Sequence, residues 1–325
     1  MATGILIFQF IGLAVCIALW VSGLIRRIRS GEMLPTQEQQ VSPIGILDIG
    51  VTVAIWMALQ TVALAVVPLK MGIGFEELGN LQSMPADQLL EFTGWVMLSQ
   101  LAATLLTIAY FLIRHPRVQW LELRNSFGNK LLVGIVGSLM LIPVVMAIQM
   151  FVTTRIPYEH PTIDSLMENF SLPTAIWAWI AAVGVAPLTE EFFFRGIIQG
   201  WLQRVFDYDE PKEVWFIGGP VIPKTARELN KETDDRKLLR FWIPIVITSI
   251  LFAVMHMGQG PAPIPLFFLS LGLGYIFRKT GSFVPCVIIH LILNSLSMIV
   301  LTLTILFPEL APPQVEAAPA MFWIW

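Results

Sequence analysis

Residues 188–196 read LTEEFFFRG and lie inside an apolar stretch that spans residues 174–206. An ionisable side chain inside a membrane helix is costly, so it needs a partner and usually marks a function. Glu191 and Arg195 are four residues apart with the acid on the N-terminal side, the favourable order for an ion pair on one helix. Glu190 points about 100° away around the helix and has no such local partner. The stretch therefore predicts a structural Glu191–Arg195 pair and leaves Glu190 for another role.

The composition of the whole chain indicates a membrane protein. Of its 325 residues, 56% are hydrophobic and only 13% are charged, and the mean hydropathy is +0.73. Ordinary soluble chains carry roughly 25% charged residues. The net charge of −3 indicates no nucleic-acid partner. Cys16 and Cys286 both lie in apolar segments, so we interpret them as small core residues rather than a disulfide or a zinc motif.

Apolar stretches of about 17–25 residues are candidate membrane-spanning helices. The sequence predicts an all-α, polytopic membrane helix bundle with about eight such spans. They lie at residues 4–25, 45–69, 92–113, 131–153, 174–206, 241–257, 261–277 and 282–306. The fifth is too long for one crossing, and the sixth and seventh are near the lower limit. The first lacks a preceding basic residue and is followed by RRIR, which favours an anchor over a cleavable signal peptide.

The basic residues predict the orientation of the bundle. All of the 20 Lys and Arg residues except Lys70, Arg155 and Arg195 fall in the segments that follow the first, third, fifth and seventh spans. Because Lys and Arg near helix ends stay on the cytoplasmic side, these segments are expected to be cytoplasmic and both termini external. We expect a multi-pass protein of a prokaryotic plasma membrane, with the lipid bilayer as its surroundings.

The chain divides by composition into three parts. Residues 1–172 carry about four N-terminal spans, residues 173–306 carry the polar motifs, and residues 307–325 form a Pro/Ala-rich tail. The second part contains a hydrophilic cytoplasmic insert at residues 207–240. Within the insert, Thr225 and Glu228 form a capping-box pattern that predicts a surface helix.

Two histidines and an asparagine extend the polar set. His256 closes the sixth span in FAVMH, with Phe252 one turn before it, and His290 shares a helix face with Asn294 in HLILN. We expect His115 and His160, which lie in loops beside prolines, to be in solvent. Each polar residue taken alone has a structural explanation, such as packing between membrane helices. Together they predict a buried polar site in the last four spans.

The stretches EEFFFR, FAVMH and HLILN resemble the three motifs E-E-x-x-x-R, F-x-x-x-H and H-x-x-x-N of the type II CAAX prenyl endopeptidases. That family belongs to a larger CAAX-protease and bacteriocin-processing group of intramembrane peptidases, also called the abortive-infection family. The resemblance covers residues 174–300 at most. It implies an endopeptidase that cuts near the C-terminus of a membrane-anchored protein or peptide, with prenylated CAAX-type proteins among the candidate substrates. It also implies the catalytic residues, listed here in chain order: Glu190, Glu191, Arg195, His256, His290 and Asn294.

By the same resemblance, Glu190 activates the water with help from His256, and His290 and Asn294 polarise the substrate carbonyl. These residue types suffice for peptide hydrolysis without a cofactor, because they offer a base and donors for an oxyanion. A catalytic zinc is the alternative, with Glu190, His256 and His290 as its three ligands. Glu191 would then have to be the base, although it is expected to form an ion pair with Arg195. The chain also has no H-E-x-x-H motif, which is typical of zinc peptidases. We favour the metal-free mechanism and keep Zn²⁺ open.

Two further matters stay open at this point. Counted from the predicted span ends at 1.5 Å per residue, Glu190 and His256 differ in depth by more than about 10 Å. A shifted helix start, or kinks at Pro187 and Pro244, would be needed to bring them together. Two other functions also remain. A transporter or proton relay uses similar Glu and His residues, and a non-catalytic immunity or scaffold protein can share the fold of a peptidase.

Overall fold

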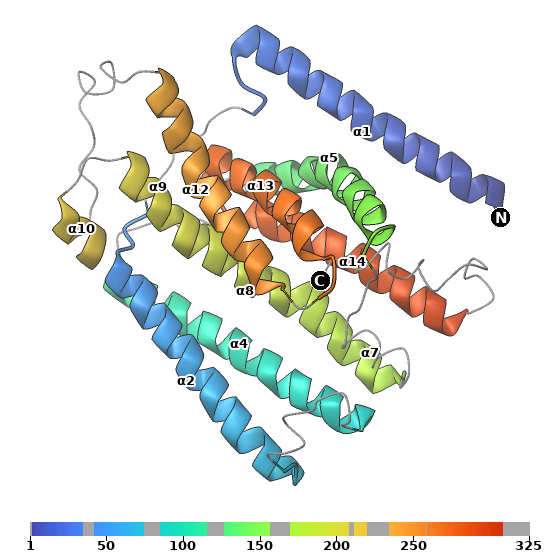
Figure 1. The fold of residues 1–325 in the computed structure, drawn as a ribbon, viewed down its shortest axis with the longest axis vertical. Helices are drawn as coiled ribbons and strands as arrows, with labels where there is room; N and C mark the ends of the chain where they lie inside the picture. The colour runs from blue at the N-terminus through green and yellow to red at the C-terminus, as the bar shows by residue number, and fades with distance from the viewer. Residues whose placement is uncertain are drawn as a thin grey trace.

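A computed structural model describes residues 2–34, 42–74, 85–115, 127–156, 170–207, 211–219, 234–257 and 259–307. Most of the described residues are helical and none is in a strand, so the predicted all-α fold is confirmed. Each predicted span coincides with a helix (Figure 1). Seven of these are α1 (Ala2–Ser30), α2 (Ile46–Met71), α4 (Ala86–Arg114), α5 (Phe127–Thr153), α12 (Asp234–Met255), α13 (Pro263–Thr280) and α14 (Val284–Leu306). The eighth is a segmented helical run over residues 172–207.

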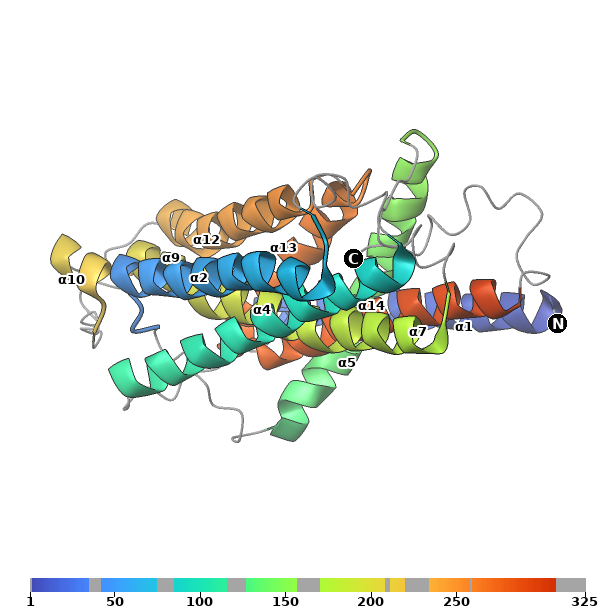
Figure 2. The same ribbon diagram turned by 90° about the horizontal axis from the view of Figure 1, so that it is seen from below.

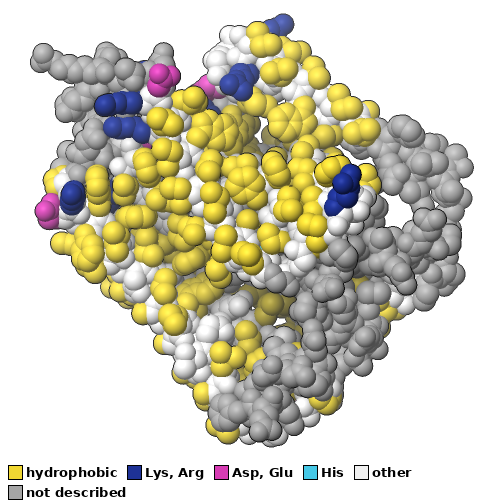
Figure 3. Space-filling model, in the orientation of Figure 1, with side chains coloured by type: hydrophobic (Ala, Val, Ile, Leu, Met, Phe, Trp, Pro, Cys, Tyr) yellow, Lys and Arg dark blue, Asp and Glu magenta, His cyan; other side chains and the backbone are white. Residues whose placement is uncertain are grey.

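The chain is a multi-pass membrane protein. Within the described residues, six helices are long and apolar enough to cross a membrane, and α1 and α13 are not among these six. Side chains such as Met57 and Leu132 are more than half exposed, which suits a surface that faces lipid. Figure 3 shows hydrophobic side chains across the centre of one face, with most of the Lys and Arg side chains near its margin. The orientation relative to the membrane stays a prediction.

The helical run over residues 172–207 changes its geometry four times. It consists of α7 (Leu172–Trp179), the π-helix η3 (Ile180–Val185), α8 (Ala186–Glu191), the π-helix η4 (Phe192–Gln199) and α9 (Gly200–Asp207). Ser171 caps its start by accepting a hydrogen bond from the Thr174 backbone N–H (3.3 Å). π-Helical segments are rare and often occur at functional sites. Here they lie on both sides of Glu190 and Glu191.

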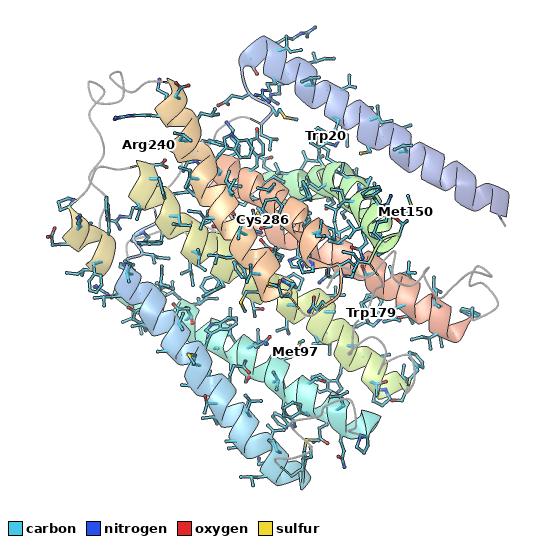
Figure 4. All side chains as sticks on the ribbon, in the orientation of Figure 1. Trp20, Met97, Met150, Trp179, Arg240 and Cys286 are labelled. Atoms are coloured by element: carbon cyan, nitrogen blue, oxygen red, sulfur yellow. The ribbon has the colours of Figure 1, made fainter. Side chains whose placement is uncertain are left out.

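Close helix packing at α5 depends on glycine. A Cβ atom at Gly134 or Gly137 would lie 2.7 Å from the side chain of Ile288 or Ile289 on α14, closer than real contacts allow. Small residues therefore let α5 approach α14 directly, as is common between membrane helices. Figure 2 shows α5 crossing the other helices steeply. On its other side α5 contacts α1, where Trp20 Nε1 donates a hydrogen bond to the Met140 carbonyl (3.1 Å; Figure 4).

Both cysteines are buried, which confirms their interpretation as small core residues. Cys286 is fully buried at the centre of the bundle, where its thiol contacts the Leu273 carbonyl on α13 (3.3 Å; Figure 4). Cys16 is also buried. The insert is described only at its ends, by α10 (Lys212–Ile217) and the start of α12. The predicted cap at Thr225, the residue His160 and all of the tail beyond residue 307 lie outside the described residues.

The expectation that His115 is in solvent is wrong. Its side chain is buried, and its Nε2 lies 3.3 Å from Oδ2 of Asp48, a fully buried carboxylate on α2. Asp48 also accepts hydrogen bonds from the Tyr110 hydroxyl (2.7 Å) and the Gly45 backbone N–H (2.9 Å). Arg114 donates to the Ile217 carbonyl of α10 (3.2 Å). The proline beside His115 predicts a loop in water. The prediction fails because the imidazole contacts the buried carboxylate of Asp48, which lies 67 residues away in the sequence.

From these contacts of Asp48 we expect the variant Asp48→Ala to be less stable than the wild type. The substitution leaves the Tyr110 hydroxyl and the Gly45 N–H without their acceptor in a buried place, and hydrogen bonds to charged groups contribute roughly 1.5–3 kcal/mol each. We expect a lower unfolding temperature for the purified protein in detergent. Asp235→Ala, at an exposed position of α12, is the matched control and should unfold like the wild type. Equal unfolding temperatures for the two variants would contradict a stabilising role for Asp48.

Candidate functional site

The predicted Glu191–Arg195 ion pair forms. Arg195 Nε donates to Glu191 Oε2 at 2.9 Å, and neither side chain is exposed. The second carboxylate oxygen, Oε1, lies 3.0 Å from Nδ1 of His290 on α14. A carboxylate oxygen only accepts, so His290 Nδ1 carries the proton and its Nε2 is turned away from Glu191. Glu191 therefore holds both a cation and a histidine in place, and its two oxygens are occupied.

The remaining contacts of Arg195 involve residues that the sequence motifs do not include. Arg195 Nη2 donates to the Ser270 hydroxyl on α13 (3.0 Å), and the guanidinium lies over the Phe252 ring at 5.4 Å. Its Nη1 is buried without a hydrogen-bond partner among the described residues. Ser270 lies in an ordinary apolar helix, so no local pattern in the sequence indicated this contact.

Glu190 and His256 face each other across a short gap. Glu190 Oε2 lies 3.9 Å from His256 Nε2, which is too long for a hydrogen bond. Glu190 Oε2 is itself buried and has no partner within the described part of the chain, although 27% of the side chain is exposed. Glu190 is thus the less constrained of the two glutamates, as the local spacing predicts.

The end of α12 determines the tautomer of His256. The Phe252 carbonyl belongs to the last turn of the helix, where backbone carbonyls lack an intrahelical donor. His256 Nδ1 lies 2.7 Å from this carbonyl oxygen, which can only accept, so Nδ1 carries the proton. In a neutral imidazole the lone pair is then on Nε2, the nitrogen that faces Glu190.

Asn294 supplies a backbone hydrogen bond that Pro187 cannot make. In a π-helix the N–H of residue i bonds to the carbonyl of residue i−5. The Ala186 N–H makes this bond to the Ala181 carbonyl. The next residue is Pro187, which has no N–H for the Ala182 carbonyl. Asn294 Nδ2 donates to that carbonyl at 2.8 Å. One amide N–H of Asn294 is therefore used to hold the backbone two turns before Glu190.

The depth conflict between Glu190 and His256 disappears in the structure. Arg240 Nη1 donates to the Asp207 backbone carbonyl (3.2 Å), so the end of α9 and an early turn of α12 lie at one level. From that level both helices run about 25 Å, at 1.5 Å per residue, to Glu190 and to His256. The reason is that the run over residues 172–207 is 36 residues long, so Glu190 lies about as far from its Asp207 end as from its Leu172 end. Counting from the predicted outer end alone misplaces Glu190.

The polar residues gather around one aromatic ring. The Phe252 ring lies 4.8 Å from His256 and 6.0 Å from His290, and it packs against Phe194 at 5.0 Å. The structure thus places two pairs side by side, Glu190 with His256 and Glu191 with His290. Asn294 lies one turn beyond His290 on α14 and contacts Ala182.

The donor set does not fit the three-ligand zinc site. Within the described ranges, no three His, Cys, Asp or Glu side chains lie close enough to hold one metal ion. The Nε2 of His290 stays free while Nδ1 contacts Glu191, as in many zinc-bound histidines, but His290 does not join Glu190 and His256 in one group of donors. A catalytic zinc usually needs three protein ligands on one ion. Glu190 and His256 alone supply two donors.

The comparison with protein families agrees with this geometry. Residues 172–296 match the family model described as type II CAAX prenyl endopeptidase Rce1-like. The matched segment begins at α7 and ends within α14, so it contains Glu190, Glu191, Arg195, His256, His290 and Asn294. No curated protein and no solved structure matches the chain. At the level of the family, the match indicates a protease. Residues 172–296 of this membrane protein are therefore similar to the Rce1-like type II CAAX prenyl endopeptidases.

Proposed function

We propose that this protein is an intramembrane endopeptidase that hydrolyses a peptide bond near the C-terminus of a membrane-anchored protein or peptide, with Glu190 as the base. The observation that carries the proposal is the gap between Glu190 Oε2 and His256 Nε2. Two acceptors that are 3.9 Å apart and do not bond to each other can both accept a hydrogen bond from one water molecule. Buried polar atoms without a protein partner are the usual positions of such waters.

A water in this gap is oriented for attack. One of its protons is directed to Glu190 Oε2 and the other to the lone pair of His256 Nε2. Its own lone pair then points away from both acceptors, toward a substrate carbonyl. As the C–O bond forms, Glu190 takes the proton from the water, and the protonated carboxyl later transfers it to the leaving amine. This is general acid–base catalysis, in which a positioned group typically contributes about 10²–10⁴ in rate.

The neighbouring Glu191–His290 pair provides a hydrogen-bond donor for the oxyanion that forms when water attacks the substrate carbonyl. With Nδ1 held by Glu191, the imidazolium form of His290 donates Nε2–H to a developing negative charge. The second amide N–H of Asn294 is the other candidate donor, since the first is bonded to Ala182. Such donors act strongly because they are fixed before the reaction begins. The fully buried Glu191 does not act as the base in this scheme, because both of its oxygens are occupied.

The proposed mechanism uses no metal ion, and its test is peptide cleavage by the purified protein in liposomes. We expect cleavage of a C-terminally prenylated CAAX-type peptide at a bond near its C-terminus. The rate should be unchanged after treatment with a strong chelator and after removal of the chelator with added zinc. Loss of activity with the chelator and recovery with zinc would favour the zinc mechanism. Proton flux without any cleavage would instead favour a proton relay and contradict the proposal.

A further inference from the structure

The N-terminal half of the chain places two unused hydrogen-bond donors near the candidate site. Trp56 Nε1 and Gln60 Nε2, both on α2, are buried and have no hydrogen-bond partner among the described residues. Buried donors without an acceptor are costly, and few occur in folded proteins. Residues four apart on a helix share one face, so the two donors point to the same side of α2. Nothing in the proposed chemistry of Glu190 uses them.

That side of α2 faces the catalytic helical run. The Trp56 ring lies 5.7 Å from the Phe193 ring of η4, three residues after Glu190. Ile49, seven residues before Trp56 and therefore on almost the same face, packs against the central core that includes Phe192 and Phe252. Gln60 is one turn further along the same face.

The two helices run in opposite directions. Arg204, in α9, contacts the carbonyl of Ser42, just before α2, whereas Phe193 contacts Trp56. Residue numbers in the run over residues 172–207 therefore decrease in the direction in which they increase along α2. Gln60 lies four residues beyond Trp56, and Glu190 lies three residues before Phe193. At 1.5 Å per residue, Gln60 and Glu190 are within about 1.5 Å of the same level in the membrane.

The spacing of the donors matches an extended peptide. Residues four apart on a helix are separated by about 6 Å along its axis. Carbonyl groups on the same side of an extended chain recur every two residues, about 6.6–6.8 Å apart. A peptide must be extended for attack at its carbonyl, because a helix keeps its carbonyls in internal hydrogen bonds. A substrate segment that lies along α2 would satisfy both donors and hold its scissile bond at the level of Glu190.

We propose that Trp56 and Gln60 bind two alternate backbone carbonyls of the substrate and hold it extended beside Glu190. This inference rests on the proposed peptidase function and assigns to α2, outside the matched domain, a part in substrate binding. The contact is made before and during the reaction alike, so its loss should raise KM and leave kcat nearly unchanged.

The test compares Trp56→Phe and Gln60→Met with Trp20→Phe in proteoliposomes, using a fluorogenic prenylated CAAX-type peptide. Phenylalanine keeps an aromatic ring against Phe193, and methionine keeps the length of glutamine, while both lose the donor. Each variant should raise KM about three- to tenfold, the effect of one ordinary hydrogen bond. Trp20 bonds to Met140 on the opposite edge of the bundle, so its variant should keep the wild-type KM. Unfolding temperatures establish that all three are folded.

A scan of the peptide tests the geometry. Each backbone carbonyl is replaced in turn by a thioamide, whose sulfur is a weaker acceptor than oxygen. Besides any effect at the scissile carbonyl, the thioamide should raise KM at two positions separated by two residues in the wild type. One of these two effects on KM should vanish in each variant. An unchanged KM in both variants, or sensitive positions with another spacing, would overturn the proposal. If the wild type binds the peptide without cleaving it, the peptidase function fails alone, and Kd then replaces KM as the measure for α2.

Discussion

Glu190→Gln is expected to yield a stably folded protein that has lost peptide cleavage by about 10²–10⁴-fold, the usual contribution of a general base. Glutamine keeps the shape of the side chain but cannot take a proton from water. Stability should be preserved because Glu190 makes no hydrogen bond with His256, and 27% of its side chain is exposed. The measurements are kcat/KM on a membrane-anchored peptide and the unfolding temperature in detergent.

Glu213→Gln is the matched control for this experiment. It is the same chemical change at an exposed position of α10, and it should alter neither cleavage nor stability. A folded Glu190→Gln protein with wild-type cleavage would refute Glu190 as the base. If the variant instead loses both activity and stability, its inactivity does not report on catalysis. The assignment of a catalytic role to Glu190 and a structural role to Glu191 is then wrong.

Glu191→Gln is expected to have the opposite phenotype, with a large loss of stability. Of the Arg195 contacts described above, those with the Ser270 hydroxyl and the face of Phe252 remain, and neither carries a negative charge. Removing one partner of a buried ion pair typically costs about 3–5 kcal/mol. The variant should accumulate poorly in membranes and unfold at a lower temperature. Any folded fraction should cleave slowly, because His290 has lost the carboxylate that orients it.

The double variant Glu191→Gln/Arg195→Met separates charge from packing. Replacing both members of a buried ion pair is often neutral, because no uncompensated charge remains. We therefore expect the double variant to recover much of the stability that Glu191→Gln loses, while cleavage stays low. The coupling between the two sites follows from the cycle of single and double variants. A Glu191→Gln protein as stable as the wild type would contradict the structural role of Glu191.

The membrane helices and the Glu191–Arg195 pair follow from the sequence because they depend on short-range order. A run of apolar residues is enough to predict a membrane helix, and an acid four residues before a base is enough to predict an ion pair. The contrast between Glu190 and Glu191 has the same origin, since one of them has a partner within a single turn. The three motifs in the sequence also single out the six polar residues of the candidate site, whose catalytic roles stay a prediction.

The tertiary structure decided which of these groups meet. The contacts of His290 with Glu191, Arg195 with Ser270 and Asn294 with Ala182 join different helices, across sequence separations of 99, 75 and 112 residues. Local patterns carry no information on such pairs. The burial of His115 on Asp48, and the common level of Glu190 and His256, depend in the same way on how far neighbouring helices extend and how they pack. Hydropathy locates a helix in the sequence but not its rotation or its depth, and those two quantities determine the geometry of this site.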